Sequence, residues 1–441
     1  MIIGNGRVIT NDPTKAYIEN GAVLIRGNLI EEVGDFQTLK NANPEEETID
    51  VRGRLIMPGM ICAHSHIYSA YARGMAVSKP TRNFHEVLQN LWWSLDKKLT
   101  LEDVRLNALT TYIESVQNGV TTLIDHHSSP RAIAGSLFAI KEAAEELGIR
   151  TSLCYEVSDR DGEAAMLAGI KENIDFIKAC RLDDHGDRIK ALFGLHASFT
   201  LSNETLYKVK EAMEGYDNGY HVHVAEGIED QFASLRNYGK RVVERLYDFG
   251  LLGDRTIAVH CVHVNQRELD ILKETDTSVV HNPESNMNNA VGVPPVVSMI
   301  KQGIRVGLGT DAYTNDMFES MKVAHILQKH HLCDPTAGFL ETKTMQFENN
   351  PKILGKYFQK DIGILKKGAY ADIITLDYDP PTPLDGGNWF GHALFGLSGR
   401  MVCDTIIGGK FVMRNREITG VDVHEIMAKS RERARKIWLE M

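Results

Sequence analysis

Short apolar runs alternate with amphipathic segments through the middle of the chain. Eight runs are typical of strands: 59–66, 120–127, 150–157, 190–196, 220–226, 256–263, 277–283 and 305–312. Helical patterns fall between them, for example over 100–119 and 137–148. Near-continuously apolar strands that alternate with helices indicate a parallel sheet covered by helices. Eight such units predict an α/β fold, a distorted (β/α)₈ TIM barrel. An open doubly wound sheet is the alternative, but no Gly-rich phosphate loop follows any strand.

The two ends of the chain are β-rich instead. Residues 1–10 and 21–34 near the start, and 371–379 and 403–418 near the end, are β-branched runs broken by turn residues. Neither end is long enough to form a stable sheet alone, so we expect them to pair in one small β-sandwich. The expected division is 1–56 for the first part of the sandwich, 57–365 for the barrel, and 366–441 for the second part with a C-terminal helix from about Val423.

Polar side chains gather at one place in each predicted unit. Almost every strand ends in His, Glu or Asp: His64, His66, His126, His127, His196, His223, Glu226, His260, His263, His281 and Asp311. In a barrel the carboxyl ends of all eight strands meet on one face, where barrel active sites lie. We therefore expect a single polar mouth.

His64 and His66 stand two residues apart on the first predicted strand, so both imidazoles point to the same side and can reach one ion. Alone, the pair is equally consistent with two partly buried polar residues. His223 and Asp311 end later strands and are weak signals individually. Together, three imidazoles and one carboxylate form a site suited to a divalent ion, Zn²⁺ first and Fe²⁺ second. Because such an ion makes hydroxide available near neutral pH, the sequence predicts a metal-dependent hydrolase.

The motifs, in their order, resemble the amidohydrolase superfamily in its cytosine/guanine deaminase and chlorohydrolase branch. PGMICAHSHIYSAYARGM resembles the first-strand motif, VHVAE the fifth, VHCVHV the sixth, HNPESNMNN the seventh and LGTDA the eighth. The resemblance covers nearly the whole chain. Within the branch, residues 85–130 are similar to the SsnA group of aminohydrolases.

This resemblance implies a role for each matching residue. The metal ligands would be His64, His66, His223 and Asp311. Glu226 would carry a proton to a ring nitrogen of the substrate, and His260 would hydrogen-bond the attacking water or the tetrahedral intermediate. Asp311 would also take a proton from that water. The catalytic residues implied are thus Glu226, His260 and Asp311.

The fourth predicted strand bears on the number of ions. Members of the superfamily with two metals carry a carboxylated lysine at the end of this strand. Here Lys190 lies at its start and His196 at its end. We therefore expect one divalent ion, with His196 free to hydrogen-bond the substrate.

Further substrate contacts are expected from residues near the mouth: His196, His127, Arg73, Tyr68 and His281. Only one of His126 and His127 can face the barrel axis, because side chains alternate along a strand. Trp92 and Trp93 are more typical of a core than of a lid. We interpret His263 as structural, and His325, His330 and His331 as a solvated helix face.

The predicted reaction is hydrolytic deamination of a purine- or pyrimidine-like heterocycle, with release of ammonia. Hydrolysis of a cyclic amide or of a chloride on the same scaffold is the alternative. A non-catalytic barrel relative is more remote, since all four ligands, Glu226 and His260 are present.

Composition narrows the partners. The net charge of −10 argues against a nucleic-acid or anionic-membrane partner, and no apolar stretch reaches membrane-spanning length. The six cysteines are scattered without a C-x-x-C pair, which is typical of reduced thiols in a cytoplasmic protein. We expect a small heterocyclic substrate and a homo-oligomer, a dimer or larger.

Overall fold

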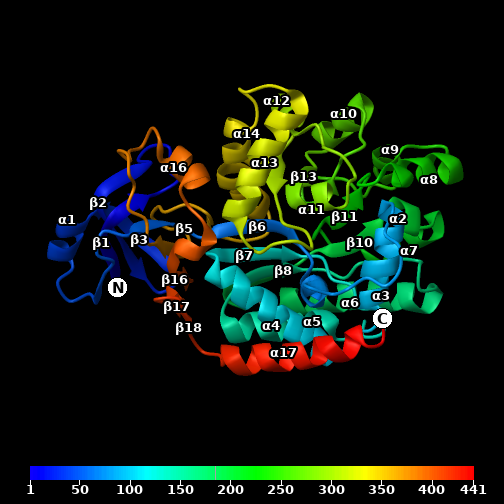
Figure 1. Cartoon of the computed structure of the whole chain (residues 1–441), viewed down its shortest axis with the longest axis horizontal. Coiled ribbons are helices and arrows are strands. Elements are labelled where there is room, and N and C mark those ends of the chain that lie inside the picture. Colours follow the sequence, from blue (N-terminus) through cyan, green and yellow to red (C-terminus); the bar gives the residue numbers. More distant parts are fainter. Residues whose placement is uncertain (184) are drawn as a thin grey trace.

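The computed structural model describes residues 1–183 and 185–441. Figure 1 shows two parts, a sheet built from both chain ends and a barrel surrounded by helices. The barrel strands are β6 (Met60–Ser65), β7 (Val120–Asp125), β8 (Arg150–Leu153), β9 (Ile189–Ala191), β10 (Phe193–Ala197), β11 (Tyr220–Val224), β12 (Ile257–His260), β13 (Ser278–His281) and β14 (Val306–Leu308). They form two parallel sheets, β6-β7-β8-β9 and β10-β11-β12-β13-β14.

Backbone hydrogen bonds close these two sheets into one barrel. The fourth predicted strand is split at Leu192, so that β9 pairs with β8 and β10 pairs with β11. On the opposite side, the amides of Thr310 and Asp311 both donate to the carbonyl of His64 at 3.0 Å, which joins β14 to β6. The predicted distorted eight-stranded barrel is therefore confirmed, and the split fourth strand is its irregular point.

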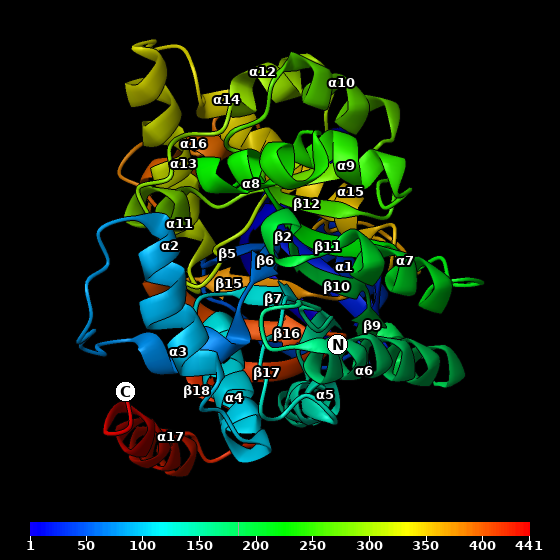
Figure 2. The same cartoon turned by 90° about the vertical axis from the view of Figure 1, so that its right-hand side faces the viewer.

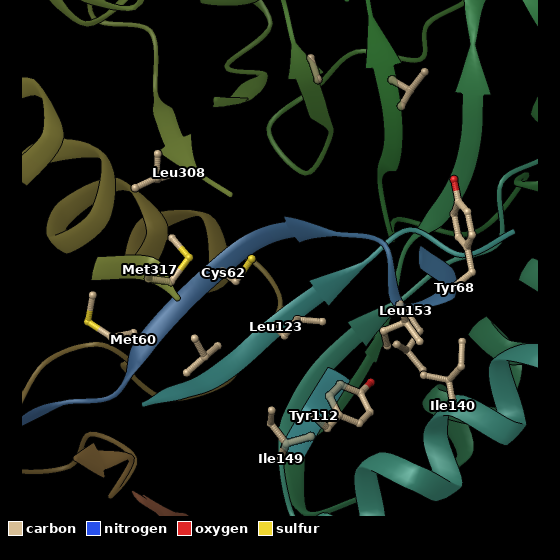
Figure 3. Packing of buried hydrophobic residues seen from close by; sticks show 14 of the residues in the cluster. Met60, Cys62, Tyr68, Tyr112, Leu123, Ile140, Ile149, Leu153, Leu308 and Met317 are labelled. Carbon is tan, nitrogen blue, oxygen red and sulfur yellow. The ribbon is translucent and has the colours of Figure 1, made fainter. Parts of the chain in front are cut away.

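Helices surround the barrel strands, as the amphipathic patterns predict. They are α4 (Leu101–Gln117), α5 (Ser136–Leu147), α6 (Glu163–Leu182), α7 (Asn203–Ala212), α8 (Ile228–Tyr238), α9 (Val242–Asp248), α10 (Gln266–Glu274), α11 (Pro283–Asn288), α12 (Val296–Lys301), α13 (Met317–Leu332), α14 (Phe339–Lys343) and α15 (Asn350–Leu354). Figure 3 shows the resulting core, where Leu123 and Leu153 from the strands lie near Tyr112 of α4 and Ile140 of α5. Burying such side chains supplies most of the free energy that holds helices against a sheet.

The two ends of the chain pair in one nine-stranded sheet, as expected. Its order is β18-β17-β16-β15-β5-β1-β2-β3, with β4 paired to β1. The strands are β1 (Ile2–Ile9), β2 (Tyr17–Arg26), β3 (Leu29–Asp35), β4 (Thr48–Asp50), β5 (Leu55–Pro58), β15 (Ile373–Leu376), β16 (Val402–Ile407), β17 (Lys410–Arg414) and β18 (Glu417–Ile418). The two halves meet where β5 and β15 run antiparallel. Helices α1 (Phe36–Ala42) and α16 (Trp389–Phe395) complete this part.

The C-terminal helix α17 (Val423–Trp438) returns to the barrel and lies along α4 in both views (Figures 1 and 2). Arg433 fixes it there, because its Nε donates to Asp103 Oδ1 at 2.7 Å. Within the described ranges, no helix is both long and apolar enough to span a bilayer.

One helix lies beside the barrel mouth, at the end away from the terminal sheet (Figure 1). It comprises α2 (Phe84–Val87), a π-helical turn (Leu88–Trp92) and α3 (Trp93–Asp96). We refer to residues 84–96 as the mouth helix. A π turn holds one more residue than an α turn and therefore rotates the side chains that follow it.

Candidate metal centre

The predicted ligands converge from three separate strand ends. His66 Nε2 lies 3.1 Å from His223 Nε2 and 3.3 Å from Asp311 Oδ1. His64 Nε2 lies 3.8 Å from the same carboxylate oxygen. All four side chains are buried. Two nitrogen ligands of a tetrahedral zinc ion are about 3.3 Å apart, so these spacings are those of a shared ion.

The hydrogen bonds of these residues fit a bound cation. His66 Nδ1 donates to the carbonyl of His126, which leaves a lone pair on Nε2. That lone pair faces the carboxylate of Asp311 and the ring of His223, while the buried Nε2 of His64 has no hydrogen-bond partner. Burial lowers the pKa of His64, His66 and His223, so the rings are neutral, which is the form that binds metals. Acceptors that face one another out of water repel unless a cation lies between them, so the donor set fits a divalent ion.

The strand ends that carry these groups adopt strained backbone conformations. Asp311 (φ 56°), His260 (φ 72°) and Ala225 (φ 48°) are left-handed residues other than glycine. Each costs on the order of 1 kcal/mol, which the surrounding hydrogen bonds must offset. The amide of Ala225, for example, donates to Asp230 Oδ2 at 3.0 Å. Strain of this kind clusters where a fold must aim a side chain at a site.

A second set of side chains lies beside the predicted ligands. His260 Nδ1 accepts a hydrogen bond from Asn286 Nδ2 at 2.8 Å, so its proton is on Nε2. That nitrogen is 3.4 Å from Glu226 Oε2 and 3.6 Å from Asp311 Oδ2. Burial, and next the charge of Asp311, raise the pKa of Glu226 well above its usual range. The predicted catalytic residues are thus adjacent, and a proton can pass among them.

Residues at or just after α11 orient this second set. Ser285 Oγ donates to Asp311 Oδ2 at 2.6 Å, and Asn289 Nδ2 donates to Glu226 Oε1 at 3.2 Å. Asn286 hydrogen-bonds His260 in the same way. One short helix and the residue that ends it therefore supply a polar partner to each predicted catalytic side chain. The motif HNPESNMNN therefore contributes through Ser285, Asn286 and Asn289.

A cavity of about 50 Å³ opens beside the centre. Aromatic and apolar side chains line much of it: Tyr68, Phe84, Leu88, Trp92, Trp93 and Phe199. This cavity adjoins a wider one of about 490 Å³, and His66, Trp92 and Asp311 line both. Ligand sites commonly measure about 300–1,000 Å³, so the space beside the centre is small for a ligand site while the adjoining cavity lies within that range.

The prediction that Trp92 and Trp93 belong to the core rather than to a lid is wrong for Trp93 and holds in part for Trp92, which packs against the core. Both side chains are partly exposed and line the cavity. Two consecutive residues face the same space because the π turn over Leu88–Trp92 rotates the helix just before Trp93.

The expected substrate contacts divide into three groups. His196 and Tyr68 line the cavity at the metal centre. Arg73 lines the adjoining wide cavity, where it is paired with Glu114. His281 is fully buried with neither ring nitrogen hydrogen-bonded, and it is not part of either lining.

Of the two histidines that follow β7, His126 rather than His127 faces the histidine cluster, which differs from our choice of His127. The His126 ring stacks on His221 at a centroid distance of 4.5 Å and lies 4.6 Å from His223. The ring of His127 points away, and its Nε2 is 2.9 Å from Ser129 Oγ. The residues alternate as expected, and the register decides which one turns inward.

Other histidines and Lys190 are accounted for by local partners. His263 Nε2 donates to the carbonyl of Val291 at 2.8 Å. Lys190 pairs with Asp187, away from the mouth. His330 and His331 are exposed, but a solvated position for His325 is wrong: it is buried against Phe339 and Phe395.

Sequence reasoning missed two residues of the cluster. His221 stands two residues before His223 on β11, and its Nε2 is 2.9 Å from Nδ1 of His64. The spacing of two was the signal that both rings point inward. Glu156 ends the third apolar run and lines the cavity, with Oε1 3.3 Å from His126 Nδ1.

The chain is similar to known deaminases over nearly its whole length. The 5'-deoxyadenosine deaminase of Methanosarcina mazei is 32% identical over 442 residues, covering 99% of this chain and 98% of that protein. The 5-methylthioadenosine/S-adenosylhomocysteine deaminase of Thermococcus sibiricus is 33% identical over 418 residues, covering 94% of each chain. The crystal structure of an adenosine deaminase from Xanthomonas campestris with bound zinc has a similar fold, with a TM-score of 0.85 at 23% identity, covering 99% of this chain and 98% of that one.

The narrower similarity of residues 85–130 to the SsnA group stays a prediction.

The sequence model of the amidohydrolase family matches residues 55–412, which include the whole barrel. With the fold, the order of the strand-end motifs and this match in agreement, the chain belongs to the amidohydrolase family.

Proposed function

We propose that this chain is a hydrolytic deaminase that acts on the purine ring of an uncharged nucleoside, with a single zinc ion. The observation that carries the proposal is the contact of Glu226 and Asp311 with His260 Nε2, at 3.4 and 3.6 Å, directly beside the predicted ligands. Relatives named as deaminases of adenosine derivatives match 94% and 99% of the chain. They support both a purine ring as the substrate and deamination as the reaction.

In this proposal His64, His66, His223 and Asp311 hold the ion. A bound divalent ion lowers the pKa of a water molecule towards neutrality and so supplies the nucleophile. Asp311 would accept a proton from the water that attacks the ring carbon bearing the amino group, and Ser285 keeps this carboxylate oriented.

Glu226 then donates a proton to the ring nitrogen next to the attacked carbon, and Nε2–H of His260 hydrogen-bonds the added oxygen. Asp311 passes its proton to the amino group and the hydroxyl of the adduct returns a proton to Glu226. The carbon–nitrogen bond to the amino group then breaks, ammonia leaves, and a carbonyl remains. A departing amino group must be protonated whereas chloride need not be, and the proton that Asp311 takes from the water can supply it.

The charge of the cavity supports an uncharged substrate. Its lining contains Glu156, Glu226, Glu229, Asp230 and Asp311, and among the residues that the structure describes there it has no lysine or arginine. Arg160 lies near this lining but is already paired with Asp96 and Asp161, so a phosphate placed here would meet carboxylates without a free cation other than the metal. Nucleosides with small neutral 5′ substituents therefore fit better than nucleotides.

The test is a substrate panel on zinc-loaded protein, with ammonia release and ring absorbance followed together. The panel is 5'-deoxyadenosine, adenosine 5'-monophosphate, guanine, a cyclic ureide and a chlorotriazine. We expect ammonia from 5'-deoxyadenosine, with kcat/KM at least tenfold above that for the monophosphate. Ring opening or chloride release without ammonia would overturn the proposal.

A further inference from the structure

The mechanism above leaves one buried carboxyl at the centre without a role. Glu156 follows β8 and is 5% exposed. Its Oε1 lies 3.3 Å from His126 Nδ1, 3.8 Å from His66 Nδ1 and 3.9 Å from His223 Nδ1. Among the described residues, no lysine or arginine forms an ion pair with it. Burial raises its pKa and the charge of Arg160 opposes this rise, but Arg160 is itself paired with Asp96. Burying a carboxylate is costly unless hydrogen-bond donors or a cation compensate its charge.

The tautomers of the neighbouring histidines determine which rings can donate a hydrogen bond to Glu156. His66 Nδ1 already donates to the carbonyl of His126. His223 faces His66 with Nε2, so a neutral His223 ring that binds an ion through Nε2 carries its proton on Nδ1. The acceptor on that side is Glu156.

His126 points to the same acceptor. Its ring is fully buried, and among the described residues no group forms a well-aligned hydrogen bond with either nitrogen, although the backbone of His221 partly opposes the lowering of its pKa by burial. Because a neutral imidazole carries one N–H, one of these nitrogens must donate or remain unsatisfied. Nδ1, the nearer to Glu156, is the nitrogen that can donate after a small shift.

We propose that Glu156 is a positioning residue of the metal centre. Its carboxylate accepts hydrogen bonds from Nδ1–H of His126 and His223, which turns Nε2 of His223 towards the ion and tightens its binding. The proposal rests on the metal centre of the proposed function. Metal-bound imidazoles commonly donate their other N–H to a carboxylate in this way, and such partners orient the ring and raise its basicity.

Charge balance favours this role over a second ion at Glu156. One divalent ion is neutralised by Asp311 and Glu156 together. A second ion would have only His126, Glu156 and Nδ1 of His223, because Nδ1 of His66 is engaged, and it would share His223 with the first ion. A direct contact between Glu156 and the substrate is the other reading, since Glu156 lines the cavity.

The experiment compares Glu156→Gln with the wild type and with Glu172→Gln. Glu172 is a matched buried carboxylate on α6, and its hydrogen bonds among the described residues come from the backbone amides of Gly135 and Leu137, at 2.9 and 3.0 Å. Zinc affinity is measured by competition with a chromophoric chelator, and the geometry of the centre by the visible absorption of the cobalt-substituted protein. Melting of the metal-free proteins checks that each variant folds.

We expect Glu156→Gln to weaken zinc binding by about 10- to 100-fold and to shift the cobalt spectrum. Glu156→Asp should recover part of the affinity, and it carries the test if the glutamine variant does not fold. Glu172→Gln should bind zinc like the wild type. At saturating zinc, KM of Glu156→Gln should stay within about twofold while kcat falls.

Two results would overturn the proposal. Unchanged zinc affinity with a raised KM would assign Glu156 to the substrate. Two zinc equivalents in the wild type and one in the variant would make it a ligand of a second ion. Zinc affinity is measured without any substrate. A wild-type protein that binds zinc but deaminates no substrate would therefore contradict the proposed function and leave the proposal for Glu156 standing.

Discussion

Two buried polar clusters, one at each end of the barrel, satisfy their hydrogen-bonding groups very differently. At the start of β8, Arg150 lies 1% exposed at the junction with the terminal sheet. Its Nε and Nη2 donate to Asp372 at 2.9 and 3.2 Å, and its Nη1 donates to the carbonyl of Asp187 at 2.7 Å. At the mouth, by contrast, Nε2 of His64, Nε2 of His260 and both ring nitrogens of His126 have no hydrogen-bond partner among the described residues.

The difference separates a structural cluster from a functional one. The hydrogen-bonding groups of Arg150 and Asp372 are satisfied by protein partners, and the pair joins the barrel to the sheet. The histidine cluster gathers neutral rings whose lone pairs face a carboxylate, an arrangement that needs a further group to be stable. At the mouth, the gathering of several such nitrogens around one carboxylate is what marks the site.

The largest effect is expected from removing a ligand. His223→Ala or Asp311→Ala should lower kcat/KM on the order of 10⁴-fold or more, because the residues of such a centre act as a unit. Zinc should also no longer raise the unfolding midpoint of either variant, since a ligand stabilises only the state that binds it. Metal content by elemental analysis and thermal melts with and without zinc check this. A variant that keeps both zinc and turnover would remove that residue from the centre.

Glu226→Gln should separate metal binding from proton transfer. The amide keeps the shape of the side chain but cannot deliver the proton, so kcat should fall by about 10²- to 10⁴-fold. Bound zinc should remain near the wild-type content. Steady-state kinetics with elemental analysis on the same sample measure both, and full retained activity would exclude Glu226 from the proton path.

At the other cluster, Arg150→Met should cost stability and leave the chemistry intact. It leaves Asp372 buried without its cation, a loss of about 3–5 kcal/mol in the free energy of unfolding. Urea unfolding measures the loss, while kcat of the folded enzyme should change less than about twofold. Adding Asp372→Asn should restore part of the stability, because the amide oxygen still accepts from Gly408 N, which lies 2.8 Å from Asp372 Oδ1. No recovery in the double variant would mean that the charge of Asp372 was not the source of the loss.

The smallest effect is expected at the aromatic wall of the cavity. Trp93→Ala should raise KM by about three- to tenfold with little change in kcat, since an aromatic contact contributes about 0.5–1.5 kcal/mol. Its ring lies 6.1 Å from that of His196 and 6.4 Å from that of Phe199. Trp93→Phe is the matched control and should keep most of the affinity. An equal rise in KM for both variants would point to a contact specific to the indole.

Much of the architecture could be predicted from the chain, because the strands are short apolar runs that end in polar residues. The pairing of His64 with His66 follows from the two-residue repeat of a strand. The rotation of Trp92 and Trp93 into the cavity could not be predicted, since a π turn has no reliable sequence signal. The inward position of His126 depends on the register of β7, which alternation alone leaves open.

The partners that orient the site were also out of reach of sequence reasoning. Ser285, Asn286 and Asn289 are ordinary polar residues in the sequence, and their contacts with Asp311, His260 and Glu226 arise only when α11 packs across the mouth. Glu156 was within reach, because it ends an apolar run as the other site residues do.

Zinc titration of the metal-free protein tests the central claim most directly. Zinc is added in steps to protein stripped with a chelator, and ammonia release from 5'-deoxyadenosine is measured at each step. The account predicts that activity rises linearly from near zero and reaches its plateau at one zinc per chain. Full activity in the metal-free protein, or a plateau at two zinc ions per chain, would contradict it.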